Sequence, residues 1–358
     1  MAWWVSVMPK LDCRLPAVLN NFDLLRLLLA LVVVGYHLWV LTRETVFSML
    51  PKFLNAELAV DGFFVVSGFL IAMSFEKSRS IKQYFEKRVC RIYPAYLTVI
   101  ILPAILLVIF SVVSAREYFG GEWVKYIVSN LFLLNFLSPE LPGLFDENRI
   151  QAVNGALWTI KIEVMFYLLL PLLVLLMRRL GHWQVMLTVY AGSILYSAGM
   201  QWMASHEGGS FYLILERQLP GQLAFFMAGS LLFFYFDRFY SYRFPLLLIA
   251  ACGFLAAREW QFLYPIYPMM LAILVISFAT TLKYLGNWGR WGDFSYGIYI
   301  WHFPLIQLLI ATGIVAASPY LTLLILFGGV FTMAFLSWHF IERPFLNRAS
   351  HYRQAEKI

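Results

Sequence analysis

Residues 22–40 read FDLLRLLLALVVVGYHLWV. Apart from Asp23, Arg26 and His37, the side chains of this stretch are apolar or aromatic. Its length is close to the roughly 20 residues that a helix needs to cross ~30 Å of hydrocarbon, so it predicts a membrane-spanning helix. An ionisable side chain in hydrocarbon costs roughly 2.5–3.5 kcal/mol even on a lenient scale. Arg26 and His37 are therefore candidates for function.

The rest of the chain repeats this apolar pattern. Of 358 residues, 61% are hydrophobic and 13% are charged, and the mean hydropathy is +0.73. Soluble domains carry about 25% charged residues, so the composition predicts an all-α, polytopic integral membrane protein with about ten transmembrane helices. The ten candidate spans are 24–42, 58–75, 92–113, 157–177, 184–204, 221–236, 244–258, 263–280, 294–315 and 320–340.

The basic residues predict an orientation. Eighteen of the 27 Lys and Arg residues fall on the side that would hold the N-terminus, and seven fall on the other side. By the positive-inside rule this predicts an inner (plasma) membrane protein with both termini cytoplasmic. Residues 1–23 would form a cytoplasmic segment, 24–346 one membrane domain, and 347–358 a cytoplasmic tail. The net charge of +7 then needs no nucleic-acid partner.

Two further patterns predict absences. Met1–Met8 is apolar, but Lys10 follows it rather than precedes it, so a signal peptide is not expected. Cys13, Cys90 and Cys252 form no spacing motif, so neither a disulfide nor a metal site is expected.

The longest segment between expected spans is 114–156, on the outer side. Long loops inside compact domains are often functional. A cap over an external substrate site and a disordered connector are both compatible with the sequence.

Arg26 and His37 are expected to share one face of their helix. They are eleven residues apart, which is about 20° from the same direction and a rise of ~16 Å. This would put a cation near the cytoplasmic entrance and an imidazole three turns deeper. The alternative is a snorkelling Arg and a hydrogen-bonded core His.

Two acidic side chains occur in other spans. Asp61 lies near the start of the stretch AVDGFFVVSGFLI and near the outer surface, and Gly62 and Gly68 permit the close approach of another backbone. Glu163 lies about 9 Å beyond the start of its span, and Lys161 points to nearly the opposite face, so the two are not expected to pair. A buried carboxylate needs a partner or stays protonated.

The span GDFSYGIYIWHFPL places Ser295, Tyr299 and His302 at i, i+4 and i+7, on one face. His302 would lie near mid-depth, either bonded structurally or orienting a second catalytic group. The last span ends in SWHFIERPF, where Glu342 and Arg343 are interpreted as a salt bridge at the cytoplasmic surface.

The stretch KRVCRIYPAY places Arg88 and Arg91 three residues apart at the cytoplasmic end of the third span. Two guanidiniums on one helix face suit bidentate phosphate binding. Ordinary positive-inside anchoring would give the same pattern.

These blocks, in this order, resemble the acyltransferase-3 family of membrane O-acyltransferases. The resemblance runs from about residue 20 to 346. Its blocks are Arg26 and His37 in the first span, Asp61-Gly-Phe-Phe-Val-Val-Ser67-Gly68-Phe, Arg88-x-x-Arg91-Ile-Tyr-Pro94, Leu157-Trp158-Thr-Ile-Lys-Ile-Glu163, Ser295-Tyr296-Gly-Ile-Tyr299-Ile-Trp-His302-Phe-Pro304 and Glu342-Arg343-Pro344.

The resemblance implies ten core spans, an acyl-CoA donor and a carbohydrate acceptor. It implies a catalytic role for Arg26 and His37, and it places the donor nucleotide on Arg88 and Arg91. Many members have a second acidic residue after Glu163, where this chain has Val164. Many also carry an extracytoplasmic hydrolase-like domain, which is not expected here.

The resulting prediction is transfer of an acetyl group from acetyl-CoA to a hydroxyl of a cell-surface polysaccharide or glycolipid, without a metal. Membrane lipid and the carbohydrate acceptor are the expected partners. A transporter of an anionic lipid or glycan precursor is the alternative, although no inverted repeat is visible. The predicted catalytic residues are His37, Arg26 and Glu163. The predicted substrate and donor contacts are Arg88, Arg91, Asp61, Ser67, Trp158, Tyr299 and His302.

Overall fold

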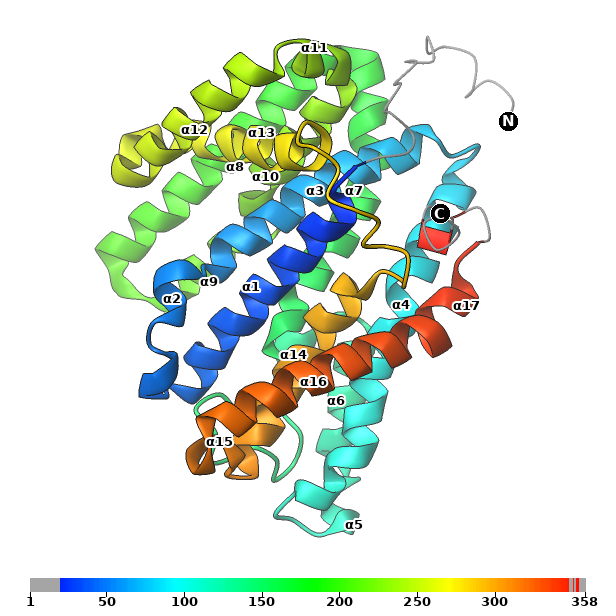
Figure 1. Ribbon diagram of the computed structural model, residues 1–358, viewed down its shortest axis with the longest axis vertical. Helices are drawn as coiled ribbons and strands as arrows, with labels where there is room; N and C mark the ends of the chain where they lie inside the picture. Colours follow the sequence, from blue (N-terminus) through cyan, green and yellow to red (C-terminus); the bar gives the residue numbers. More distant parts are fainter. Residues whose placement is uncertain (1–19, 348–349, 351, 354–358) are drawn as a thin grey trace.

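The computed structural model describes residues 20–347, 350, 352 and 353. In this part of the chain the protein consists of helices and loops and has no strand (Figure 1), which confirms the all-α prediction. Lys10, Cys13 and most of the expected terminal segments 1–23 and 347–358 lie outside the described residues.

Each of the ten expected spans overlaps a helix, although α4 begins at Ile81 rather than at the expected residue 92. These helices are α1 (Phe22–Thr42), α3 (Ala56–Glu76), α4 (Ile81–Leu106), α7 (Trp158–Leu180), α8 (His182–Met203), α10 (Leu219–Phe234), α12 (Arg243–Glu259), α13 (Tyr267–Thr280), α14 (Phe294–Ala311) and α16 (Pro319–Leu336). The shorter elements are η1 (Thr45–Phe47), α2 (Leu50–Phe53), η2 (Leu107–Phe110), α5 (Ala115–Tyr118), α6 (Gly121–Leu131), η3 (Asn135–Leu137), η4 (Gly155–Leu157), η5 (Ala204–Gly208), α9 (Ser210–Glu216), α11 (Phe236–Ser241), η6 (Gln261–Ile266), α15 (Ile314–Ala317), η7 (Ser337–Glu342) and α17 (Arg343–Phe345).

Seven helical segments in the described residues are long and apolar enough to cross a membrane. They contain α1, α3, α4, α7, α13, α14 and α16, so the protein is polytopic. The number ten is not confirmed, because α8, α10 and α12 are not among the seven. Helices α10 and α12 have 16 and 17 residues, fewer than the roughly 20 that a span needs. Helix α8 is longer, but it carries polar side chains such as Gln184 and Gln201.

Helices α3 and α10 pack backbone against backbone. A Cβ atom at Gly68 would lie 2.1 Å from Phe226 O, and one at Gly229 would lie 2.1 Å from Val65 O. Small residues allow membrane helices to approach this closely, as expected for Gly68. The contact fixes α3, which carries side chains of the site described below.

Helix α14 lies among α1, α4 and α16 (Figure 1). Thirteen of its 18 residues are buried. A helix that is apolar on all sides belongs in the interior of a bundle, and this position allows α14 to contribute polar groups at several depths.

The segment 114–156 is ordered, so the alternative of a disordered connector is wrong. Tyr96 on α4 donates from its hydroxyl to Asn130 O on α6 at 2.7 Å. Asn148 Nδ2 donates to Gln307 Oε1 at 3.0 Å, and Asn154 Nδ2 donates to Ile300 O at 2.8 Å. The first bond holds α6 against α4, and the other two hold the end of the segment against α14. That it caps a substrate site stays a prediction.

Candidate active site

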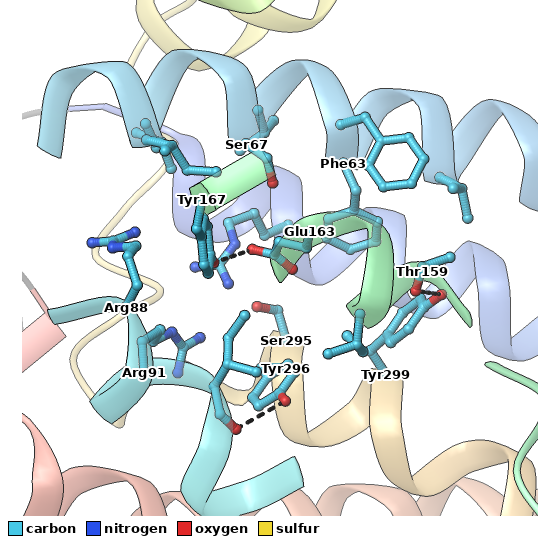
Figure 2. Close-up of a pocket in the computed structure, with 18 of the residues that line it drawn as sticks. Phe63, Ser67, Arg88, Arg91, Thr159, Glu163, Tyr167, Ser295, Tyr296 and Tyr299 are labelled. Atoms are coloured by element: carbon cyan, nitrogen blue, oxygen red, sulfur yellow. Dashed lines mark hydrogen bonds between the residues drawn. The ribbon is translucent and has the colours of Figure 1, made fainter. Parts of the chain in front are cut away.

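A pocket lies between α3, α4, α7 and α14 and encloses about 790 Å³, its open mouth included. Figure 2 shows Arg88 and Arg91 at one end, Thr159 and Tyr299 at the other, and Glu163 between them. The pocket brings together side chains from helices that are far apart in the sequence. The predicted site residues that line it are Arg26, Ser67, Arg88, Arg91, Glu163 and Tyr299.

Four charged side chains form a buried network at the arginine end of the pocket. Asp293 Oδ2 accepts from Arg26 Nη1 at 2.6 Å and from Arg91 Nη2 at 2.5 Å. Arg91 Nη1 donates to Glu342 Oε2 at 2.6 Å. Two positive and two negative charges therefore balance, as buried charges require. The network joins α1, α4, η7 and the start of α14.

The sequence placed Glu342 in a surface salt bridge, and this prediction is wrong. Its carboxylate is buried and also accepts a hydrogen bond from Ser337 Oγ at 2.9 Å. The reason is that η7 packs against α4, which turns Glu342 inward toward Arg91, a residue 251 positions away. Helix periodicity carries no signal for such a partner.

Asp293 is the residue that holds this network together. Burial by itself raises the pKa of the Asp293 carboxyl, but Arg26 and Arg91 outweigh burial and hold that pKa well below its usual range. Its Oδ1 atom accepts from Ser295 N at 3.2 Å and from Ser295 Oγ at 2.5 Å, which caps the N-terminus of α14. Asp293 is thus ionised at neutral pH.

Arg88 is in a different situation from Arg91, although both line the pocket. Arg88 Nη2 donates to Ser74 Oγ at 3.0 Å, and its Nε atom is buried without a hydrogen-bond partner in the described residues. Its guanidinium carbon lies 5.6 Å from the centre of the Tyr167 ring. The two arginines share a pocket as expected, but only Arg88 has no carboxylate partner among the described residues.

Glu163 lies in the middle of the pocket wall. Tyr167 OH donates to Glu163 Oε1 at 2.5 Å (Figure 2). Lys161 Nζ donates to Gln218 Oε1 at 2.6 Å instead, so the prediction that Lys161 and Glu163 do not pair is confirmed.

An aromatic and hydroxyl cluster closes the far end of the pocket. The hydroxyls of Thr159 and Tyr299 are 2.7 Å apart and share a hydrogen bond. The Phe63 ring packs edge-on against Tyr299, with the ring centres 5.7 Å apart. The Tyr299 ring in turn lies 5.9 Å from the ring of His302.

His37 and His302 contact each other just beyond this end. His37 Nδ1 and His302 Nε2 are 2.9 Å apart, and the two rings are nearly parallel at 13°. Because Arg26 and His37 meet Asp293 and His302, which both belong to the region of α14, the prediction of one shared face on α1 is confirmed.

Besides His37 and His302, two further predicted site residues are not among those that line the pocket. Asp61 lies on α3 near Tyr267 of α13. Trp158 packs edge-on against Phe64, with the ring centres 6.5 Å apart. Their predicted roles in substrate binding stay predictions.

The sequence reasoning missed four residues of the site, Asp293, Thr159, Tyr167 and Tyr352. Asp293 had a signal, since it lies two residues before Ser295, the first residue of a quoted block. Tyr352 had none, yet its hydroxyl accepts from Arg26 Nη1 at 3.1 Å and its ring centre lies 4.5 Å from the Arg91 guanidinium carbon. It lines the pocket at the arginine end.

The fold and the pocket define a polytopic helical membrane protein with a cavity between its helices that several charged side chains line. Residues 19–342 match the family described as "Acyltransferase domain", the acyltransferase-3 family. The match covers nearly the whole chain, so the protein belongs to this family of acyltransferases.

Curated relatives match most of this chain. An O-acetyl transferase of Shigella phage Sf6 is 26% identical over 92% of this chain and 97% of its own. Nodulation protein 10 of Rhizobium leguminosarum bv. viciae is 28% identical over 91% and 92%. The peptidoglycan O-acetyltransferase OatA of Listeria monocytogenes is 26% identical over 90% of this chain and 55% of its own. No solved structure matches the chain.

Proposed function

We propose that the protein transfers an acetyl group from acetyl-CoA to a hydroxyl of a cell-surface polysaccharide or glycolipid. The observation that carries this proposal is the pocket itself. At one end lies Arg88, which has no carboxylate partner among the described residues. At the other end lies Tyr299, whose ring contacts that of His302. A long, anionic thioester donor needs a site of this form.

Arg88 is the donor-phosphate residue in this proposal. The charges of Arg26 and Arg91 are balanced by Asp293 and Glu342, which leaves Arg88 to provide net positive charge inside the mouth. A guanidinium with a free N–H suits a phosphate oxygen. Glu163 and Ser67, farther along the wall, would meet the polar groups of the pantetheine arm.

His37 is the general base. It takes the proton of the acceptor hydroxyl as that oxygen attacks the thioester carbonyl, the C–S bond breaks, and the CoA thiolate leaves and is protonated. A second route, in which the acetyl group first forms a bond to His37 and is then passed to the acceptor, uses the same residues. In both routes Arg26 acts through Asp293 to hold α1 against α14.

The acceptor class rests on the relatives. Proteins named O-acetyl transferase and peptidoglycan O-acetyltransferase match most of this chain. Their names support transfer to an oxygen, with a carbohydrate hydroxyl as the acceptor. The positive-inside count supports an inner (plasma) membrane location with both termini cytoplasmic. The contact between Tyr352 and Arg26 agrees with this, because it places the described end of the chain beside the start of α1.

The test uses the purified protein in nanodiscs with radiolabelled acetyl-CoA and extracted surface glycan. We expect CoA release and label transfer by the wild type, and a decrease of about 10²–10⁴-fold in His37→Ala, the usual contribution of a general base. The control is His206→Ala, since His206 is exposed. Wild-type activity in His37→Ala would refute the mechanism. A wild type that neither binds nor turns over acetyl-CoA would favour the transporter alternative.

A further inference from the structure

We infer that His302 is a positioning residue that fixes the tautomer of His37, so that Nε2 of His37 is the basic nitrogen. The inference rests on the proposed function for its chemical meaning, but its evidence is the hydrogen bonding of the two rings. His302 Nδ1 lies 2.6 Å from Tyr299 O, and His302 Nε2 lies 2.9 Å from His37 Nδ1.

The carbonyl of Tyr299 decides the direction of both bonds. A backbone carbonyl oxygen only accepts, so His302 Nδ1 must carry a hydrogen and donate it. In a neutral imidazole the other nitrogen is then an acceptor, so His302 Nε2 accepts. His37 Nδ1 is therefore the donor of the bond between the rings. The remaining nitrogen, His37 Nε2, keeps its lone pair and points away from His302.

The arrangement also selects where an added proton goes. A proton on His37 Nε2 leaves its Nδ1–H bond to His302 intact and makes that bond charge-assisted, hence stronger. A proton on His302 Nε2 would instead remove the acceptor and break the bond. The pair thus acts as a base through His37 alone, with His302 supporting the cation that forms during transfer.

No carboxylate shares this task among the described residues. Neither ring takes part in an ion pair, and their ring neighbours are Tyr36, Tyr299 and Phe303. Two charged groups lie nearby on neighbouring segments. Arg149 donates to Val40 O at 2.5 Å, and Glu163 is close enough to interact electrostatically with the Tyr299 hydroxyl. The role that a carboxylate has in a Ser-His-Asp triad is filled here by a second imidazole anchored on a carbonyl.

The experiment replaces His302 by Leu, Gln and Glu and measures acetyl-CoA turnover against pH in nanodiscs. Leu has no acceptor for His37, so we expect turnover to fall by about 10²-fold, because a base in the wrong tautomer loses most of its effect. Gln keeps an acceptor oxygen and no charge, so it should recover about tenfold over Leu with the wild-type pH profile.

The variant His302→Glu places a negative charge beside His37, which favours the protonated form of His37. Turnover should therefore begin to fall at a higher pH, with the acid limb of the pH–rate profile moved by about one unit or more. His339→Leu is the matched control, because His339 also bonds a carbonyl of its own helix, Phe335 O at 3.0 Å, but lies away from the pocket.

Thermal unfolding of each variant identifies any that fails to fold. If Leu does so, Gln and Glu still decide the question. Equal turnover and identical pH profiles in all folded variants would overturn the role of His302 while the wild-type activity still stands. A wild type without turnover would overturn the proposed function instead.

Discussion

The two ends of the pocket treat buried polarity in opposite ways. At one end four charges, centred on Arg91 and Asp293, neutralise one another. At the other end His37 and His302 share one hydrogen bond, with no carboxylate partner in the part of the chain that the structure describes. Because an unpaired buried charge is costly, the first end must keep its ionisation fixed. In the proposed mechanism the second end takes up a proton on His37, so one region would maintain the geometry and the other would supply the base.

Removing one member of the network should give the largest effect on stability. In Arg91→Ala the carboxylates of Asp293 and Glu342 lose their shared partner, and breaking a buried ion pair costs about 3–5 kcal/mol. We expect the free energy of unfolding, measured by denaturation in detergent, to fall by that amount. Arg88→Ala, three residues earlier on α4, is the control and should change it by less than about 1 kcal/mol. Equal stabilities would contradict the structural role of Arg91.

Arg88 should show the reverse pattern, with a smaller effect that is confined to the donor. Losing one charge-assisted hydrogen bond to a phosphate costs about 1.5–3 kcal/mol, which corresponds to roughly 10- to 100-fold in affinity. We expect KM for acetyl-CoA to rise by that factor in Arg88→Ala, with kcat and unfolding unchanged. The control is Arg79→Ala. Arg79 is exposed and lies just before the start of α4, so its loss should leave KM for acetyl-CoA unchanged. A drop in kcat alone would refute phosphate binding by Arg88.

The smallest effect comes from pH. The pKa of Asp293 is held below its ordinary value of about 3.9, so its carboxylate stabilises the fold fully above about pH 4. This contribution is lost only as the pH falls through the lower pKa of the folded state. The difference in unfolding midpoint between wild type and Asp293→Asn should therefore be smaller at about pH 3 than at about pH 5.5. Equal differences at these two pH values would contradict the ion pairs.

The sequence predicted those features that depend on neighbours along one helix. Runs of apolar residues located every long helix, and the 3.6-residue period placed Arg26 and His37 on one face. The same reasoning kept Lys161 apart from Glu163. The length rule was less reliable for α10 and α12, whose 16 and 17 residues fall below a full span.

What the sequence could not predict depends on contacts between distant segments. Arg91 meets Asp293 across 202 residues, and His37 meets His302 across 265. Periodicity says which way a side chain points from its own axis, but it does not say which helix lies opposite. For this reason the sequence predicts a surface position for Glu342, whereas the structure buries it against Arg91.

Helix α1 is fastened to the α14 region at two points, Arg26 to Asp293 and His37 to His302. The two contact residues are eleven positions apart on α1. Their partners, Asp293 and His302, are nine positions apart, which corresponds to roughly 16 Å and 14 Å of helix. A slide of one helix past the other by a single turn, ~5.4 Å, would undo both at once. The two contacts together therefore oppose sliding of α1 along α14, so we expect the two helices to keep one register.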